Sequence, residues 1–128
     1  MAIMKRIELT ISDIRPIDGD TVEAWVEIHR EIRMRWRIRL VGIEGGELPT
    51  PDGHRSQAAL FAAISTRRQH NPRFVGNPDT RDKYGRHIGD IMFDPAELLT
   101  CILLATGAYW LKDRTGAERP YNEQTIQL

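Results

Sequence analysis

Three short segments contain charged side chains of the types that can bind and cleave phosphate esters in proteins. The first is the turn Asp18-Gly19-Asp20-Thr21, the second runs from Arg39 to Glu47, and the third runs from Asp82 to Arg86. A guanidinium group binds a phosphate through two parallel hydrogen bonds, whereas carboxylate and carbonyl oxygens are the ligands of Ca²⁺. We therefore expect one phosphodiester-binding site if the fold brings the three segments together.

Each segment also has an ordinary structural explanation. Asp-Gly is a common hairpin turn, so the first segment is a weak signal alone. The acids Glu44 and Glu47 fit a solvated loop after an edge strand, and Arg86 fits an exposed position at a hairpin turn. The combination of the three carries more weight than any one of them.

Together the segments resemble the signature of the staphylococcal nuclease-like (thermonuclease) family. That signature reads Asp-Gly-Asp-Thr, then Arg-Leu-x-Gly-Ile-Asp-x-Pro-Glu, then Asp-x-Tyr-Gly-Arg. This chain has Asp18-Gly19-Asp20-Thr21, Arg39-Leu40-Val41-Gly42-Ile43-Glu44-Gly45-Gly46-Glu47 and Asp82-Lys83-Tyr84-Gly85-Arg86 in the same order. The resemblance covers Ile7 to Trp110 and implies a Ca²⁺-dependent endonuclease that hydrolyses DNA and RNA, preferably single-stranded, with little sequence specificity.

The resemblance implies a calcium site and a handler of the attacking water. Asp20 and Glu44 would bind Ca²⁺ with the help of the carbonyl group of Gly45. Glu47 would orient or deprotonate the water molecule. Calcium ions accept such varied oxygen ligands at several coordination numbers.

The same resemblance implies contacts to the substrate. Arg39 and Arg86 would clamp the reacting phosphate, and Lys83 and Tyr84 would line the pocket for a terminal phosphate or a base. Three further aromatic residues are candidates for contacting a base at the pocket edge: Tyr109, Trp110 and Tyr121.

Two departures from the signature favour a second function. The family's Asp is Glu44 here, and its Pro before the last Glu is Gly46, which gives the loop more conformational freedom and predicts a weaker cation site. The alternative is a catalytically weak or inactive OB-fold module that binds nucleic acid or a protein.

The pattern of apolar residues predicts an α+β class, with a five-stranded OB-fold barrel and two to three packed helices. One domain, residues 1–128, carries all of them. The helices are expected over Ser56 to Arg68 and from an Asp94 N-cap, with Pro95 first in the helix, to about Thr106. The expected strands cover residues 7–17, 22–28, 33–43, 73–75 and 87–93.

Within the predicted hairpin of residues 22–43, alternation assigns side chains to two faces. The inward set is Met34, Trp36, Ile38 and Leu40. Arginines 33, 35 and 37 on the other face could form a basic track, but opposite Glu23, Trp25 and Glu27 they favour a cross-strand ladder of ion pairs and cation-π contacts. The four scattered histidines are assigned to the surface, and the chain after Tyr109 is expected to be irregular.

Composition sets the remaining limits. The chain has 128 residues, 41% of them hydrophobic, which suffices for one core, and its 18 basic and 18 acidic residues argue against binding nucleic acid through bulk charge. A single cysteine, Cys101, forms no internal disulfide. No apolar run has signal-peptide or membrane-spanning length, so we expect a cytoplasmic monomer without a membrane partner, or a secreted one if a signal was removed earlier.

Overall fold

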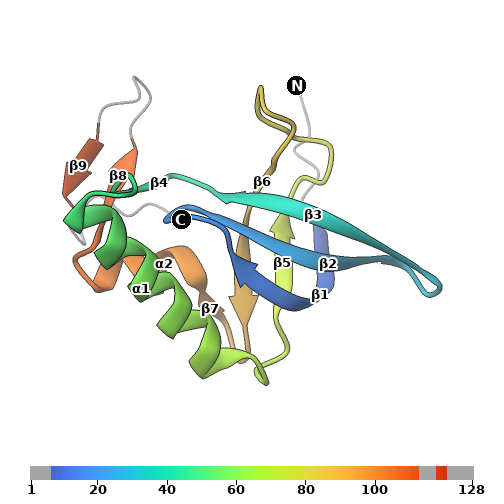
Figure 1. The fold of residues 1–128 in the computed structure, drawn as a ribbon. Helices are drawn as coiled ribbons and strands as arrows, with labels where there is room; N and C mark the ends of the chain where they lie inside the picture. The colour runs from blue at the N-terminus through green and yellow to red at the C-terminus, as the bar shows by residue number, and fades with distance from the viewer. Residues whose placement is uncertain (1–6, 113–117, 121–128) are drawn as a thin grey trace, which may run out of the picture.

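Five strands close into a barrel in the computed structural model, which describes residues 7–112 and 118–120 (Figure 1). They are β1 (Ile7–Pro16), β2 (Thr21–His29), β3 (Ile32–Leu40), β5 (Arg73–Gly76) and β6 (His87–Phe93). β1 pairs with β2 and β5, β2 pairs with β3, and β6 completes the ring between β3 and β5, parallel to β3. This architecture confirms the predicted α+β class and the five-stranded OB-type barrel.

Two helices accompany the barrel in the described part of the chain, α1 (Pro51–Arg67) and α2 (Leu99–Ala105). They contact each other and, in Figure 1, lie on the same side of the molecule. α1 begins five residues before the predicted start, because the hydroxyl group of Thr50 accepts a hydrogen bond from the backbone N–H of Gly53 at 3.0 Å. No described helix is long and apolar enough to cross a membrane.

The predicted start of the second helix at Asp94 is wrong. The carboxylate of Asp94 instead accepts a hydrogen bond from Arg73 at 2.7 Å, and the short strand β7 (Glu97–Leu98) pairs with the end of β6. The helix begins only at Leu99, where the backbone N–H and the hydroxyl group of Thr100 both donate to the buried carboxylate of Asp90. Tertiary contacts therefore override the local capping pattern.

A second, three-stranded sheet lies beside the barrel. Its strands are β4 (Ile43–Gly45), β8 (Tyr109–Lys112) and β9 (Glu118–Pro120), in the order β4-β8-β9. The chain after Tyr109 was predicted to be irregular, and this is wrong for its described residues, because β8 pairs with β4 and β9 pairs with β8. The single predicted strand over residues 33–43 is also divided, because Gly42 adopts a φ of +75° and turns the chain between β3 and β4.

The β2–β3 hairpin extends well beyond the barrel (Figure 1). Trp36 is buried at 6% exposure, as predicted, but Met34 is 49% exposed and its predicted inward position is wrong. The reason is geometric: β6 pairs with β3 only over Ile38–Leu40, so the apolar face of the hairpin runs past the end of the core at Met34.

The core contains one histidine that the sequence analysis placed at the surface. His87 is 4% exposed and stacks on the ring of Trp36 with 3.6 Å between the ring centroids. Burial, and to a smaller extent the charge of Arg81, lowers the pKa of His87 below its ordinary value. His87 therefore belongs to the barrel interior next to Arg86, whereas His29, His54 and His70 are exposed as predicted.

Candidate functional site

A polar pocket of about 390 Å³ lies where the β1–β2 turn meets β4 and the loop before α1. It is lined by Asp18, Gly19, Asp20, Glu44, Gly45, Gly46, Glu47 and Leu48. The fold thus brings together the first and second of the three segments. Four of the lining side chains are carboxylates, so the pocket concentrates oxygen atoms and negative charge.

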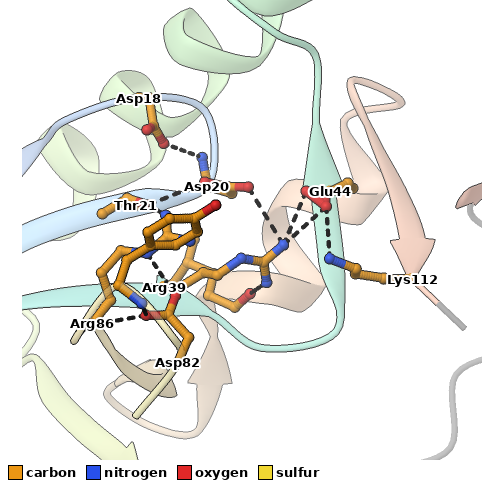
Figure 2. Close-up of polar contacts among 10 residues, drawn as sticks. Asp18, Asp20, Thr21, Arg39, Glu44, Asp82, Arg86 and Lys112 are labelled. Carbon is orange, nitrogen blue, oxygen red and sulfur yellow. Dashed lines mark hydrogen bonds and ion pairs between the residues drawn. The ribbon is translucent and has the colours of Figure 1, made fainter. Parts of the chain in front are cut away.

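Arg39 provides positive charge to this pocket. Its Nη2 atom lies 3.0 Å from both carboxylate oxygens of Glu44 and 3.6 Å from Oδ2 of Asp20 (Figure 2). Lys112 of β8 adds a second cation, 3.0 Å from Oε1 of Glu44. The chain turns at Gly42 between β3 and β4, and β4 then presents Glu44 to Arg39 near the end of β3.

Arg86 is joined to the same site through a hydroxyl group. Its Nη1 atom donates to Oγ1 of Thr21 at 2.9 Å, and that hydroxyl donates to Oδ1 of Asp20 at 3.1 Å (Figure 2). On its other side, Nε of Arg86 donates to Oδ2 of Asp82 at 2.7 Å. The third segment therefore lies beside the pocket with Arg86 held between two partners.

Asp82 is a built-in acceptor for this arginine. Desolvation has the largest single influence and raises the pKa of Asp82, but hydrogen bonds from the backbone and side chain of Arg86 and from the backbone N–H of Tyr84 outweigh it. The pKa of Asp82 is consequently below its ordinary value. The ionised carboxylate fixes the turn and the guanidinium of Arg86 together.

The other predicted site residues are more open to solvent. Glu47 is exposed, and its carboxylate has no hydrogen bond or ion pair with any described residue. Tyr84 is 72% exposed, with its ring 5.5 Å from the guanidinium of Arg86 and 5.1 Å from Nζ of Lys83. Lys83 and Tyr84 thus stand at the outer side of Arg86 rather than in the pocket wall.

Three aromatic residues were predicted as candidates for contacting a base at the pocket edge, and for Tyr109 this prediction is wrong. Tyr109 is 1% exposed and donates its hydroxyl proton to the carbonyl oxygen of Ser56 at 2.8 Å, so it is a packing residue rather than a surface for a base. Burial, together with the charges of Asp20 and Asp18, raises its pKa. Trp110 is half-buried in β8, and Tyr121 lies outside the described residues.

Ser56 positions the loop that carries the acids. This fully buried serine accepts a hydrogen bond from the backbone N–H of Gly46 at 2.9 Å and donates one to the carbonyl oxygen of Ala108 at 2.7 Å. A Cβ atom on Gly46 would lie 2.4 Å from the carbonyl carbon of Asp52. The loop therefore passes so close to α1 that only glycine fits, and the predicted extra freedom at Gly46 is removed by packing.

The pKa of Asp18 is raised above its ordinary value. Burial is the largest cause, and the neighbouring carboxylate of Asp20 adds to it. The backbone N–H of Asp20 donates to Oδ1 of Asp18 at 3.1 Å and opposes this shift. Asp18 therefore holds the turn that presents Asp20 to the pocket.

The donor set of the pocket has the chemistry of a hard-cation site. Asp20, Glu44 and the carbonyl of Gly45 are all oxygen donors, as Ca²⁺ requires, and they line one cavity. The described residues contain no cluster of three or more His, Cys, Asp or Glu side chains arranged to hold a metal ion, and Asp20 and Glu44 both pair with Arg39. A cation would bind there with two carboxylates, a carbonyl and water.

Four residues of this neighbourhood were not assigned roles from the sequence. Asp18 and Asp82 begin the first and third segments, so their positions in the motifs were an available signal. Ser56 and Lys112 gave no local signal, because they reach the site through α1 and through the pairing of β8 with β4.

The fold and the site define an OB-type barrel with an acidic pocket flanked by two arginines. No family model matches the chain, and no curated protein matches it.

Proposed function

We propose that the pocket binds and hydrolyses phosphodiester bonds of nucleic acids, with Ca²⁺ as cofactor. One observation carries the proposal: Arg39 and Arg86 are linked through Asp20 and Thr21 at the edge of a single carboxylate-lined pocket. Two guanidinium groups so placed match the charge of a phosphodiester, and the resemblance to the staphylococcal nuclease-like family is in accord with this reading.

The two arginines act on the charge that develops during hydrolysis. Attack on phosphorus increases the negative charge on the phosphate oxygens, so donors that are fixed beforehand stabilise the transition state more than the ground state. Arg86 is fixed by Asp82, and Arg39 is fixed by Glu44. Removal of one such donor typically lowers kcat by about 10²-fold to 10³-fold.

Glu47 supplies the acceptor for the proton of the attacking water. Its carboxylate lines the pocket and makes no ion pair with the described residues, so it is open to a water molecule. Arg39, by contrast, neutralises Glu44 and Asp20. This difference assigns proton transfer to Glu47 and charge binding to the pair.

Asp20, Glu44 and the carbonyl of Gly45 are the residues that would hold Ca²⁺. A bound divalent cation supplies positive charge and makes water more acidic. Arg39 forms ion pairs with the same two carboxylates. If a cation neutralised these carboxylates instead, the guanidinium of Arg39 would be available to bind phosphate.

The test is hydrolysis of a short oligonucleotide and of denatured DNA with Ca²⁺, with Mg²⁺ and with chelator. We expect Ca²⁺-dependent cleavage that falls by about 10²-fold or more in Arg86→Ala and in Glu47→Ala. Arg68→Ala, at the residue that follows α1, is the control, because its exposed side chain lies outside the pocket. If no cleavage occurred with any metal, the proposed nuclease activity would be refuted.

A substitution of Glu44 gives a second test, this time of calcium binding. Glu44→Asp shortens the side chain by one methylene, and a change in the calcium titration is expected if Glu44 is a ligand. An unchanged titration would remove Glu44 from the cation site.

A binding module is the second candidate function. It is favoured by the ion pairs of Arg39 with Asp20 and Glu44, which leave no preassembled metal cluster among the described residues. Salt-dependent binding of nucleic acid without cleavage under any metal is its expected signature.

A further inference from the structure

The outer face of the β2–β3 hairpin carries an excess of positive charge. Arg33, Arg35 and Arg37 of β3 stand opposite Glu27, Trp25 and Glu23 of β2, in that order, and Arg15 of β1 stands opposite Glu23. We call these seven residues the arginine surface. Four guanidinium groups face two carboxylates, although the whole chain has a formal net charge of zero.

The predicted ladder of ion pairs is present on this surface, and it is incomplete. Oε1 of Glu23 lies 2.8 Å from Arg15 and 2.5 Å from Arg35, while Oε2 lies 3.5 Å from Arg37. One carboxylate is thus shared by three cations. Because a guanidinium has five N–H donors, most of the donors on these side chains remain free for another anion.

Solvent exposure keeps those donors accessible. The side chain of Arg37 is 64% exposed, and that of Arg15 is 57% exposed. Glu23 is 14% exposed, but an ion pair with an arginine as exposed as Arg37 or Arg15 is worth little, so these two side chains can turn from Glu23 to a phosphate at little cost.

Trp25 lies among the arginines and adds an aromatic face. The guanidinium carbons of Arg33 and Arg35 lie 5.6 Å and 5.4 Å from its ring centroid. These cation-π contacts hold the two side chains over the strand. Trp25 itself is half-buried. Arginine side chains and an accessible aromatic ring together are the groups that bind the backbone and bases of single strands.

The arginine surface is continuous with the pocket. Arg33, Arg35, Arg37 and Arg39 alternate along β3 and share one face of it. A strand rises by 3.3 to 3.4 Å per residue, so Arg33 and Arg39 are about 20 Å apart. Figure 1 shows β3 running from the hairpin tip to β4, which carries Glu44.

We propose that the arginine surface binds the sugar-phosphate backbone of a single-stranded nucleic acid whose scissile phosphate lies in the pocket. The surface thereby makes the protein prefer substrates of several nucleotides over short ones. This role rests on the proposed phosphodiester-binding pocket, because Arg39 is the point at which the two sites join.

The test compares a trinucleotide with an oligonucleotide of about 12 nucleotides, a length in the range bound by OB folds. Binding is measured by fluorescence anisotropy in chelator, so that nothing is cleaved. In the double variant Arg33→Gln and Arg37→Gln, we expect the long oligonucleotide to bind about tenfold more weakly, since two phosphate contacts are lost, and the trinucleotide to bind unchanged.

Salt dependence gives an independent measure. The slope of log K against log salt for single strands is about −0.7 per neutralised phosphate, so loss of two contacts reduces it by about 1.4. Arg55→Gln with Arg68→Gln is the matched control, because it removes one exposed arginine within α1 and one directly after it. Arg33→Lys with Arg37→Lys keeps the charge and should retain most of the slope.

The outcomes separate the two proposals. Equal affinity of the double variant and the unaltered protein for the long oligonucleotide would overturn the arginine surface, even if the pocket cleaves short substrates. A length-dependent loss with no cleavage under any metal supports the surface and refutes the nuclease. If polyglutamate at equal residue concentration displaced the long oligonucleotide, the proposal that this surface binds nucleic acid would be overturned, and an acidic polypeptide would be the ligand instead.

Discussion

The Nη2 atom of Arg39 lies 3.0 Å from both carboxylate oxygens of Glu44, across the turn that separates β3 from β4. The two side chains are only 12% and 18% exposed, and the guanidinium of Arg39 is shielded from water more than those of Arg35 and Arg37 on the hairpin, which are 31% and 64% exposed. Their geometry ties the end of the barrel to the second sheet, which also contributes Lys112.

The first prediction concerns the strength of this pair. A double-mutant cycle with Arg39→Gln and Glu44→Gln should give a coupling free energy of unfolding of about 1 to 3 kcal/mol, because both partners are largely shielded from water. Urea denaturation measures it. The control cycle uses Arg55 and Asp52, an exposed pair 3.3 Å apart on α1, for which about 0.5 kcal/mol or less is expected. Equal coupling in the two cycles would contradict the prediction.

The second prediction concerns the buried hydroxyl group of Ser56. Ser56→Ala leaves the N–H of Gly46 and the carbonyl of Ala108 without this partner, so the free energy of unfolding should fall by about 2 kcal/mol. Ser65→Ala, at an exposed position of the same helix, should change it by about 0.5 kcal/mol or less. A similar small change for both serines would show that Ser56 does not hold the loop.

The third prediction concerns Gly46, which stands where the staphylococcal nuclease-like signature has a proline. Gly46→Pro should lower the free energy of unfolding by more than about 2 kcal/mol, because it adds atoms against the Asp52 backbone and removes the N–H that donates to Ser56. Gly46→Ala keeps that N–H, so its free energy of unfolding should lie between those of the unaltered protein and Gly46→Pro. Thermal and urea unfolding report the order. If Gly46→Pro were as stable as the unaltered protein, the close approach to α1 would be wrong.

Much of the fold was predictable because its signals are local. Period-two alternation gave five barrel strands, including the bounds of β6 at His87 and Phe93. The order of the three charged segments also predicted that Asp20, Arg39 and Glu44 would meet, and they do. Asp20 directly precedes β2 and Arg39 lies near the end of β3, which pairs with β2, whereas Glu44 follows in β4 after the turn at Gly42.

The remaining features depend on contacts between segments that are distant in sequence. Lys112 reaches Glu44 only because β8 pairs with β4, and neither strand is long enough to show a clear alternation. At Asp94 a strong helix-capping pattern was misleading, since an ion pair with Arg73 takes its carboxylate. Alternation put Met34 on the same face of β3 as Trp36, but it could not show that the barrel core ends before Met34, which is exposed.

The last prediction concerns the pH dependence of the ion pair between Arg86 and Asp82. Since the pKa of Asp82 is lowered from 3.8, the ionised carboxylate stabilises the folded protein at pH values above 3.8. That contribution is lost as the pH falls through the lower pKa of the folded state. The difference in unfolding free energy between the unaltered protein and Asp82→Asn should therefore be largest near neutral pH and narrow below about pH 4.

Urea denaturation at a series of pH values measures this difference, and protonation of His87 affects both proteins alike. Asp79→Asn in the neighbouring turn removes the same charge, but its exposed carboxylate makes no ion pair with the described residues. Its difference from the unaltered protein should stay nearly constant with pH. A constant difference for Asp82→Asn as well would mean that Asp82 does not hold Arg86 through its charge, and the guanidinium of Arg86 would then be held by Thr21 alone.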